Sequence, residues 1–165
     1  MNRLSDLNIS NQNLVIRVDM NVPIKDGVVT DNTRILACIP TIKFAQKSNA
    51  KILLVTHLGR PTEGTFDNKF SLKPVAAEVS KILGHEVDLI DDLDSTKIFK
   101  GSSDVQILEN IRFFEGEKSN CNKLGNLLSI LGDIYVFDAL VHLIENNLQR
   151  ILQLLTLIYL VRGYC

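Results

Sequence analysis

Several residue types that would narrow the possible folds are scarce in this sequence. It has no tryptophan, three cysteines and four prolines, and aromatic residues make up only 6% of its 165 residues. Cys38, Cys121 and Cys165 are scattered, and neither a Cys-x-x-Cys pair nor a Cys/His ligand spacing occurs. The cysteines therefore predict no disulfide framework and no metal site, and they indicate reduced thiols in a cytoplasmic protein.

A charge excess and a membrane-length apolar run are also missing. The net charge is -1 at pH 7, which excludes a bulk binder of nucleic acid or of membrane surfaces. The first residues have no apolar core of a signal peptide. The leucine-rich stretch 151–161 is shorter than the about 20 apolar residues that span a bilayer. We therefore expect no nucleic-acid or membrane partner, and a cytoplasmic location.

Predicted strands and helices alternate along the chain, and a hydrophobic fraction of 45% is enough for the core of one domain or of a piece of one. Pro40 predicts a kink, or a break between a first helical turn near Thr33 and the helix proper. Asp26-Gly27 predicts a hairpin turn. The expected strands cover 14–18, 51–55, 85–90, 105–109 and 134–138, and the expected helices cover 40–46, 71–83 and 123–131. This alternation is typical of a doubly wound, mainly parallel α/β sheet of the Rossmann-like kind.

Polar side chains follow the predicted strands or begin the helices between them. Because the carboxyl ends of parallel strands meet at one edge of a sheet, these side chains could share a cleft. Three arginines and a histidine suit a small polyanion, since guanidinium groups bind phosphate and carboxylate in a bidentate manner. Taken singly, each arginine could be solvated and the histidine could be an ordinary loop residue. The residues are Asp19, Asn21, Arg34, His57, Arg60 and Arg112.

Four motifs occur in an order and spacing that resemble the signatures of the phosphoglycerate kinase family. They are Arg17–Pro23 (RVDMNVP), Asp31–Ile35 (DNTRI), His57–Pro61 (HLGRP) and Leu108–Phe113 (LENIRF). The resemblance covers residues 5–139, so residues 1–139 are expected to be part of the amino-terminal, substrate-binding domain of a two-domain enzyme.

The resemblance implies a glycolytic kinase, which moves phosphate reversibly between 1,3-bisphosphoglycerate and ADP and yields 3-phosphoglycerate and ATP. It implies that Arg34 is catalytic and neutralises the phosphoryl group in transfer. Mg²⁺ with ATP or ADP would belong to the family's carboxy-terminal domain, so we expect no cofactor and no metal on this fragment. The family is usually monomeric. The implied 3-phosphoglycerate site comprises Asp19, Asn21, Arg34, His57, Arg60 and Arg112, with backbone around Met20, Leu58 and Gly59 lining it.

The resemblance stops after Asp138-Ala139, where the family continues Phe-Gly-x-x-His-Arg and this chain does not. Codons for Val141 to Arg150, read from the third base of the valine codon, permit Ala-Ser-His-Arg-Lys-Gln-Ser-Ser-Thr, which restores His-Arg. We interpret residues 140–165 as a non-family, leucine-rich tail produced by a shift of reading frame. An amphipathic helix that covers the sheet is the alternative interpretation.

This interpretation leaves the sheet incomplete at its carboxy-terminal end. The chain would carry only the 3-phosphoglycerate half-site and is expected to be inactive alone. Two alternatives stay open: a non-catalytic anion-binding remnant, and a partner-binding module that uses the tail.

The frameshift interpretation predicts an insertion or deletion of one or two bases near codon 140 of the gene. Sequencing the gene across that codon checks it. An intact nucleotide sequence without a family-like alternative frame would remove the hypothesis.

Overall fold

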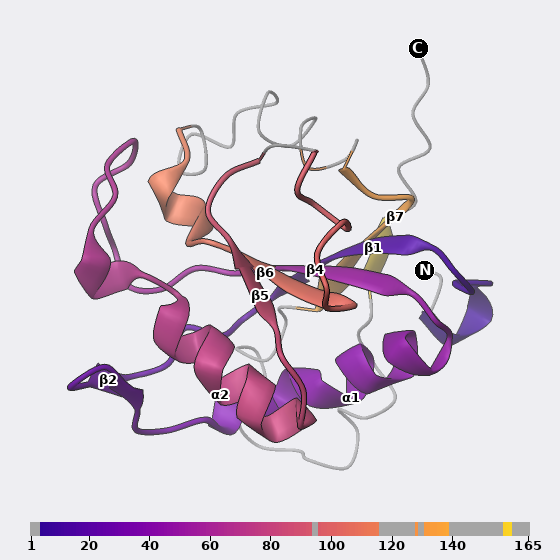
Figure 1. The fold of residues 1–165 in the computed structure, drawn as a ribbon, viewed down its shortest axis with the longest axis horizontal. Helices are drawn as coiled ribbons and strands as arrows, with labels where there is room; N and C mark the ends of the chain where they lie inside the picture. The colour runs from indigo at the N-terminus through magenta and orange to yellow at the C-terminus, as the bar shows by residue number, and fades with distance from the viewer. Residues whose placement is uncertain (1–3, 94–95, 116–127, 129–130, 139–156, 160–165) are drawn as a thin grey trace.

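The computed structural model describes residues 4–93, 96–115, 128, 131–138 and 157–159. Its centre is a six-stranded sheet with the order β5-β6-β4-β1-β7-β8 (Figure 1). Neighbouring strands from β5 to β7 run parallel, and β8 pairs antiparallel with β7. The α/β fold with a mainly parallel sheet is therefore confirmed. The strands are β1 (Asn13–Val18), β4 (Lys51–Val55), β5 (Asp88–Ile90), β6 (Val105–Leu108), β7 (Ile134–Asp138) and β8 (Leu157–Tyr159).

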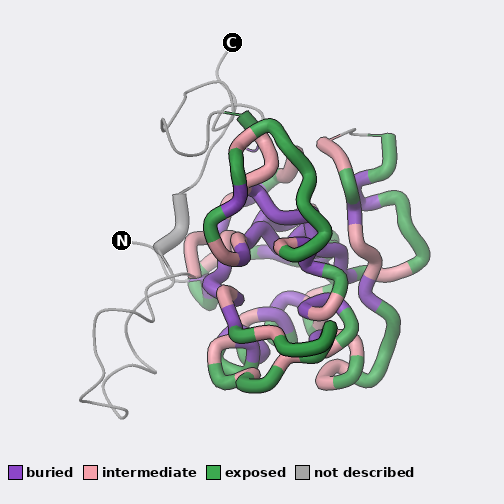
Figure 2. The backbone as a smooth tube through the Cα atoms, turned by 90° about the vertical axis from the view of Figure 1, so that its left-hand side faces the viewer, coloured by how far each residue is buried: buried purple, intermediate pink, exposed green. Residues whose placement is uncertain are grey.

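The central strands are apolar along their length because both faces of the sheet are covered. In β1, Leu14, Ile16 and Val18 belong to one core cluster, whereas Val15 belongs to a second cluster on the opposite face. This alternation follows from the two-residue period of a strand. Figure 2 shows the buried residues gathered inside a shell of exposed loops.

Among the described residues, α1 (Thr33–Lys47) and α2 (Lys73–Leu83) contribute side chains to the same core cluster and lie on one face of the sheet (Figure 1). Leu128 belongs to the cluster on the other face. The predicted hairpin is present as β2 (Ile24–Lys25) and β3 (Val28–Val29), with positive φ at Asp26 and Gly27. The described part of the chain also contains short 3-10 turns: η1 (Leu4–Asp6), η2 (Asn68–Phe70) and η3 (Ile111–Phe113).

The predicted break at Pro40 is wrong, because α1 runs through this residue without interruption. Pro40 has no N–H to donate to the Leu36 carbonyl, but both side chains are exposed, so the missing bond lies on the solvent side of the helix. Two predicted boundaries also shift: α2 begins at Lys73 rather than at residue 71, and β5 covers only the last three of the expected residues 85–90.

The remaining sequence predictions fall largely outside the described residues. The expected helix 123–131 is described only at Leu128 and Leu131, and the expected tail 140–165 only at β8. Within the described part of the chain, no helix combines the length and apolar character needed to cross a membrane.

Asp138 ends β7 and has a raised pKa. Burial moves the pKa from its usual 3.8 to about 6, although a hydrogen bond with Thr41 acts in the opposite direction. Its Oδ2 atom is buried and has no hydrogen-bond partner among the described residues. The buried Cys38 thiol lies close enough for the Asp138 charge to contribute, after burial, to raising the thiol's pKa to about 12.

The raised pKa predicts a pH-dependent stability that Asp138→Asn removes. The folded state favours the neutral carboxyl, so this contribution is complete below the unfolded pKa and disappears as the pH rises through about 6. Above about pH 7 the variant should have a free energy of unfolding about 3 kcal/mol higher than the parent, and below about pH 4 the two should agree. Urea unfolding across this pH range measures the difference, and a constant difference at every pH would contradict the prediction.

Candidate anion-binding site

The predicted site residues lie at the carboxyl edge of the parallel sheet. β1 stands between β4 and β7, and its partners align so that Arg17 pairs with Val55 and Val18 with Asp138. The chain leaves β1 toward β4 through α1 and later returns to the other side of β1 as β7. Such a reversal of strand order is where open α/β sheets bind ligands, at the carboxyl ends of the strands.

Arg34 is held at this edge by Asp19. The Arg34 Nη1 atom lies 2.9 Å from Asp19 Oδ2, and the side chains are 32% and 7% exposed, respectively. Asp19 Oδ1 accepts a hydrogen bond of 3.2 Å from the Asn21 backbone N–H. The buried carboxylate therefore fixes an arginine from the first turn of α1 next to the end of β1, while the guanidinium keeps contact with solvent.

Gly59 connects the ends of three strands. Its N–H donates to Asn21 Oδ1 (2.9 Å), and its carbonyl accepts from Arg112 Nη1 (2.5 Å). Its φ is +58°, and a Cβ at this position would overlap the Phe70 ring. Only glycine fits, since other residues rarely adopt this backbone conformation and the ring leaves no space.

These contacts form one continuous hydrogen-bonded chain across the carboxyl edge of the sheet. It runs from Arg34 through Asp19, Asn21 and Gly59 to Arg112, and so links α1, β1, β4 and the η3 turn after β6. The backbone Ile111 N–H also donates to the Thr56 carbonyl, 3.1 Å away. Residues predicted from four separate motifs are thus brought together through direct hydrogen bonds.

Backbone groups expected to line a ligand already have partners inside the protein. The Met20 N–H donates to the buried Thr56 hydroxyl at 3.0 Å, and the Leu58 carbonyl accepts from Asn110 Nδ2 at 2.8 Å. The Asn21 side-chain oxygen is likewise used by Gly59, which leaves the amide NH₂ of Asn21 as its group for a ligand. These atoms build the site, and the side chains have to make the contacts with an anion.

His57 and Arg60 flank this turn with different exposure. His57 is half-buried directly after Thr56, whereas Arg60 is exposed and makes no hydrogen bond or ion pair with any described residue. Arg60 is therefore the cation at this edge most accessible to an incoming anion, and its position depends on Gly59.

Two buried polar residues at the end of β6 received no role from the sequence. Glu109 is 5% exposed and Asn110 is fully buried. Both lie in the LENIRF motif between the strand and Arg112. A charged residue placed directly after a four-residue buried strand was the available signal, because a carboxylate there must find hydrogen-bond donors.

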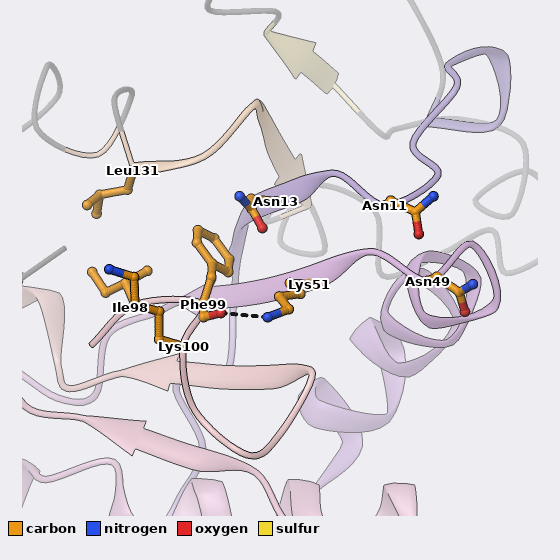
Figure 3. Close-up of a pocket in the computed structure, with 8 residues that line it drawn as sticks. All are labelled: Asn11, Asn13, Asn49, Lys51, Ile98, Phe99, Lys100 and Leu131. Atoms are coloured by element: carbon orange, nitrogen blue, oxygen red, sulfur yellow. Dashed lines mark hydrogen bonds between the residues drawn. The ribbon is translucent and has the colours of Figure 1, made fainter. Parts of the chain in front are cut away.

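A separate polar cleft of about 460 Å³ lies at the opposite, amino edge of the sheet and contains none of the predicted site residues (Figure 3). Lys51 crosses it and donates to the Phe99 carbonyl at 2.8 Å. Its polar lining consists of Asn11, Asn13, Asn49, Lys51 and Lys100. These are mostly exposed side chains, so we do not place the function of the carboxyl edge there.

The two most buried carboxylates at the carboxyl edge are already engaged, Asp19 by Arg34 and Glu109 by three hydrogen-bond donors. Arg34, Arg60 and Arg112 lie at the same edge. Guanidinium groups suit a small anion, and the fold and these residues define the chain as an α/β domain with a candidate arginine-based anion site.

Comparison with known proteins gives the family. The profile of the family "Phosphoglycerate kinase" matches residues 4–147. The phosphoglycerate kinases of Desulfovibrio desulfuricans and Nitratidesulfovibrio vulgaris are each 46% identical to this chain, over 137 and 138 residues that cover 83% of it. The chain belongs to the phosphoglycerate kinase family, which is a family of kinases.

Solved structures agree with this assignment. Phosphoglycerate kinase from Coxiella burnetii matches 82% of this chain with a TM-score of 0.76 and 40% identity. Phosphoglycerate Kinase from Pyrococcus horikoshii OT3 matches 84% with a TM-score of 0.72 and 34% identity. The chain spans only about a third of these proteins: 35% of the curated relatives, and 34% and 36% of the solved chains.

The limited space around Gly59 predicts that Gly59→Ala lowers stability much more than the same substitution at a control glycine that also has a positive φ. Gly84 has φ +79° at the end of α2, but nothing lies within 4 Å of the place that an alanine Cβ would take. Gly84→Ala should therefore cost only about 1 kcal/mol of backbone strain, whereas Gly59→Ala should cost about 3 kcal/mol through strain and contact with Phe70. Chemical denaturation measures both, and equal losses would show that the ring does not constrain the turn.

Proposed function

We propose that this chain forms the 3-phosphoglycerate half of a phosphoglycerate kinase active site. The observation that carries the proposal is the hydrogen-bonded chain from Arg34 to Arg112, which gathers the family motifs at one sheet edge. A phosphorylated three-carbon acid presents a phosphate and a carboxylate. Planar guanidinium groups recognise both, and Arg60 offers the exposed one.

Asp19 gives Arg34 a fixed place in this proposal. Phosphoryl transfer depends on alignment and on stabilising the charge of the transferred group, and less on a proton base. An arginine that is already oriented by a buried carboxylate loses less conformational freedom when the anion binds. The ion pair thus prepares Arg34 to face the transferring phosphoryl group, which is the catalytic role that the family resemblance implies.

The same proposal implies that this chain binds the phosphorylated acid but does not carry out the phosphoryl transfer. By family resemblance, the magnesium-nucleotide and the closure that excludes water require the carboxy-terminal domain. Within the described carboxyl edge, the Asp19 and Glu109 carboxylates are already engaged, which supports this separation of binding from chemistry. We therefore infer that the chain binds 3-phosphoglycerate weakly and does not form ATP by itself.

Titration calorimetry with 3-phosphoglycerate tests the proposal. The parent chain should bind, and Arg60→Ala should weaken the affinity about tenfold, since one charge-assisted contact is lost. Lys100→Ala is the matched control, because it removes an exposed cation at the amino edge and should leave the affinity unchanged. A coupled assay with 1,3-bisphosphoglycerate and ADP should show no ATP formation.

Each other outcome has a defined meaning. No binding by a folded chain would overturn the half-site and favour the partner-binding alternative. An equal effect of both substitutions would show non-specific anion attraction. ATP formation would contradict the inactivity of the chain alone.

A further inference from the structure

A buried carboxylate at the end of β6 holds the start of α2. Glu109 Oε2 accepts from the Ser71 hydroxyl at 2.7 Å, and Oε1 accepts from the backbone N–H groups of Leu72 (2.7 Å) and Asn110 (2.8 Å). None of the ion pairs found among the described residues involves Glu109. The Ser71 hydroxyl, two backbone N–H groups and the positive end of the α2 dipole therefore stabilise its charge.

The neighbouring Asn110 closes the loop that contains Gly59 and Arg60. Its Nδ2 group donates to the carbonyls of Leu58 (2.8 Å) and Phe70 (2.9 Å), which are the two ends of this loop. Its Oδ1 accepts from the Arg112 backbone N–H at 3.2 Å. One fully buried amide thus fixes both ends of the loop and the residue that donates to Gly59.

Together these contacts determine where Arg60 lies. Arg60 has no hydrogen bond or ion pair with a described residue, so its place follows from the turn at Gly59 and from the loop ends. Burying an ionised carboxylate is costly unless donors satisfy it, and an apolar residue would serve core stability with less penalty. A buried Glu109 is better explained by the position that it imposes than by its contribution to packing.

We propose that Glu109 and Asn110 are positioning residues of the anion site, which act on ligand binding through the Gly59–Arg60 turn. This inference rests on the proposed function for its ligand, 3-phosphoglycerate. Neither side chain touches the anion. Glu109 sets the start of α2 beside the loop, Asn110 fixes the loop ends, and Arg60 presents its guanidinium from the resulting turn.

The test uses Glu109→Gln, which keeps the shape and the acceptor for Leu72 but removes the charge. NMR titration with 3-phosphoglycerate, which reaches millimolar dissociation constants, should show an affinity about tenfold lower. Amide hydrogen exchange should become faster at Gly59 and Leu72. The matched control is Gln106→Glu, the reverse exchange on the same strand, since buried Gln106 accepts from Phe99 N–H (2.7 Å) away from the site. The control should lose stability and keep its affinity.

A double-substitution cycle separates positioning from general destabilisation. In the Arg60→Ala background, Glu109→Gln should change the affinity less than twofold, because the side chain that it positions is gone. An equal tenfold loss in both backgrounds would overturn the inference and indicate a structural role.

The hydrogen-exchange measurement tests the positioning contact separately from the proposed function. Absence of 3-phosphoglycerate binding by the parent would refute the proposed function and, with it, this role in binding. Unchanged exchange at Gly59 in a folded Glu109→Gln chain would refute the positioning contact whether or not the ligand binds. Asn110→Asp, which keeps the acceptor for Arg112 but replaces the Nδ2 donor, should also accelerate exchange at Gly59.

Discussion

The left-handed backbone at Gly59 is the constraint on which the site depends. Its N–H and carbonyl are bound from opposite sides by Asn21 and Arg112, and the Phe70 ring occupies the place of a side chain. A change in the conformation of this turn would therefore displace the residues that contact it at the end of β1, at the turn after β6 and at the start of α2. Since Arg60 follows directly and has no hydrogen bond or ion pair with a described residue, the turn also places this exposed cation.

The distribution of charge at this edge follows a simple physical order. Asp19 and Glu109 lie inside, whereas Arg34 and Arg60 reach toward solvent. Asp19 is balanced by Arg34, and Glu109 accepts from the Ser71 hydroxyl and from backbone N–H groups. Asp138 has a hydrogen bond with Thr41 and a buried Oδ2 without a partner among the described residues, and burial raises its pKa to about 6. The buried Asp19 thus holds Arg34 in place while Arg60 keeps the positive charge that an anion meets.

The chemistry of phosphoryl transfer allows substrate binding and nucleotide binding to be placed on different domains. A site that mainly orients anions and offers fixed positive charge can be built on one domain, before the second reactant is present. The chain covers about a third of its relatives, and the arginines at its described carboxyl edge suit the acid partner. Binding without turnover is the consequence that we propose for it.

The sequence alone was sufficient for the parallel α/β fold, the hairpin and the family, because apolar runs, turn residues and ordered motifs are local features. It also predicted that Asp19, Arg34 and Arg60 share an edge, since strand ends of a parallel sheet meet there. Only the tertiary structure showed that Pro40 lies inside a continuous helix, because the missing bond faces solvent. Only the structure gave Glu109 and Asn110 their partners: the Ser71 hydroxyl and the Leu58 and Phe70 carbonyls come from a loop some 40 to 50 residues away in sequence, and no local pattern encodes a hydrogen bond over that separation.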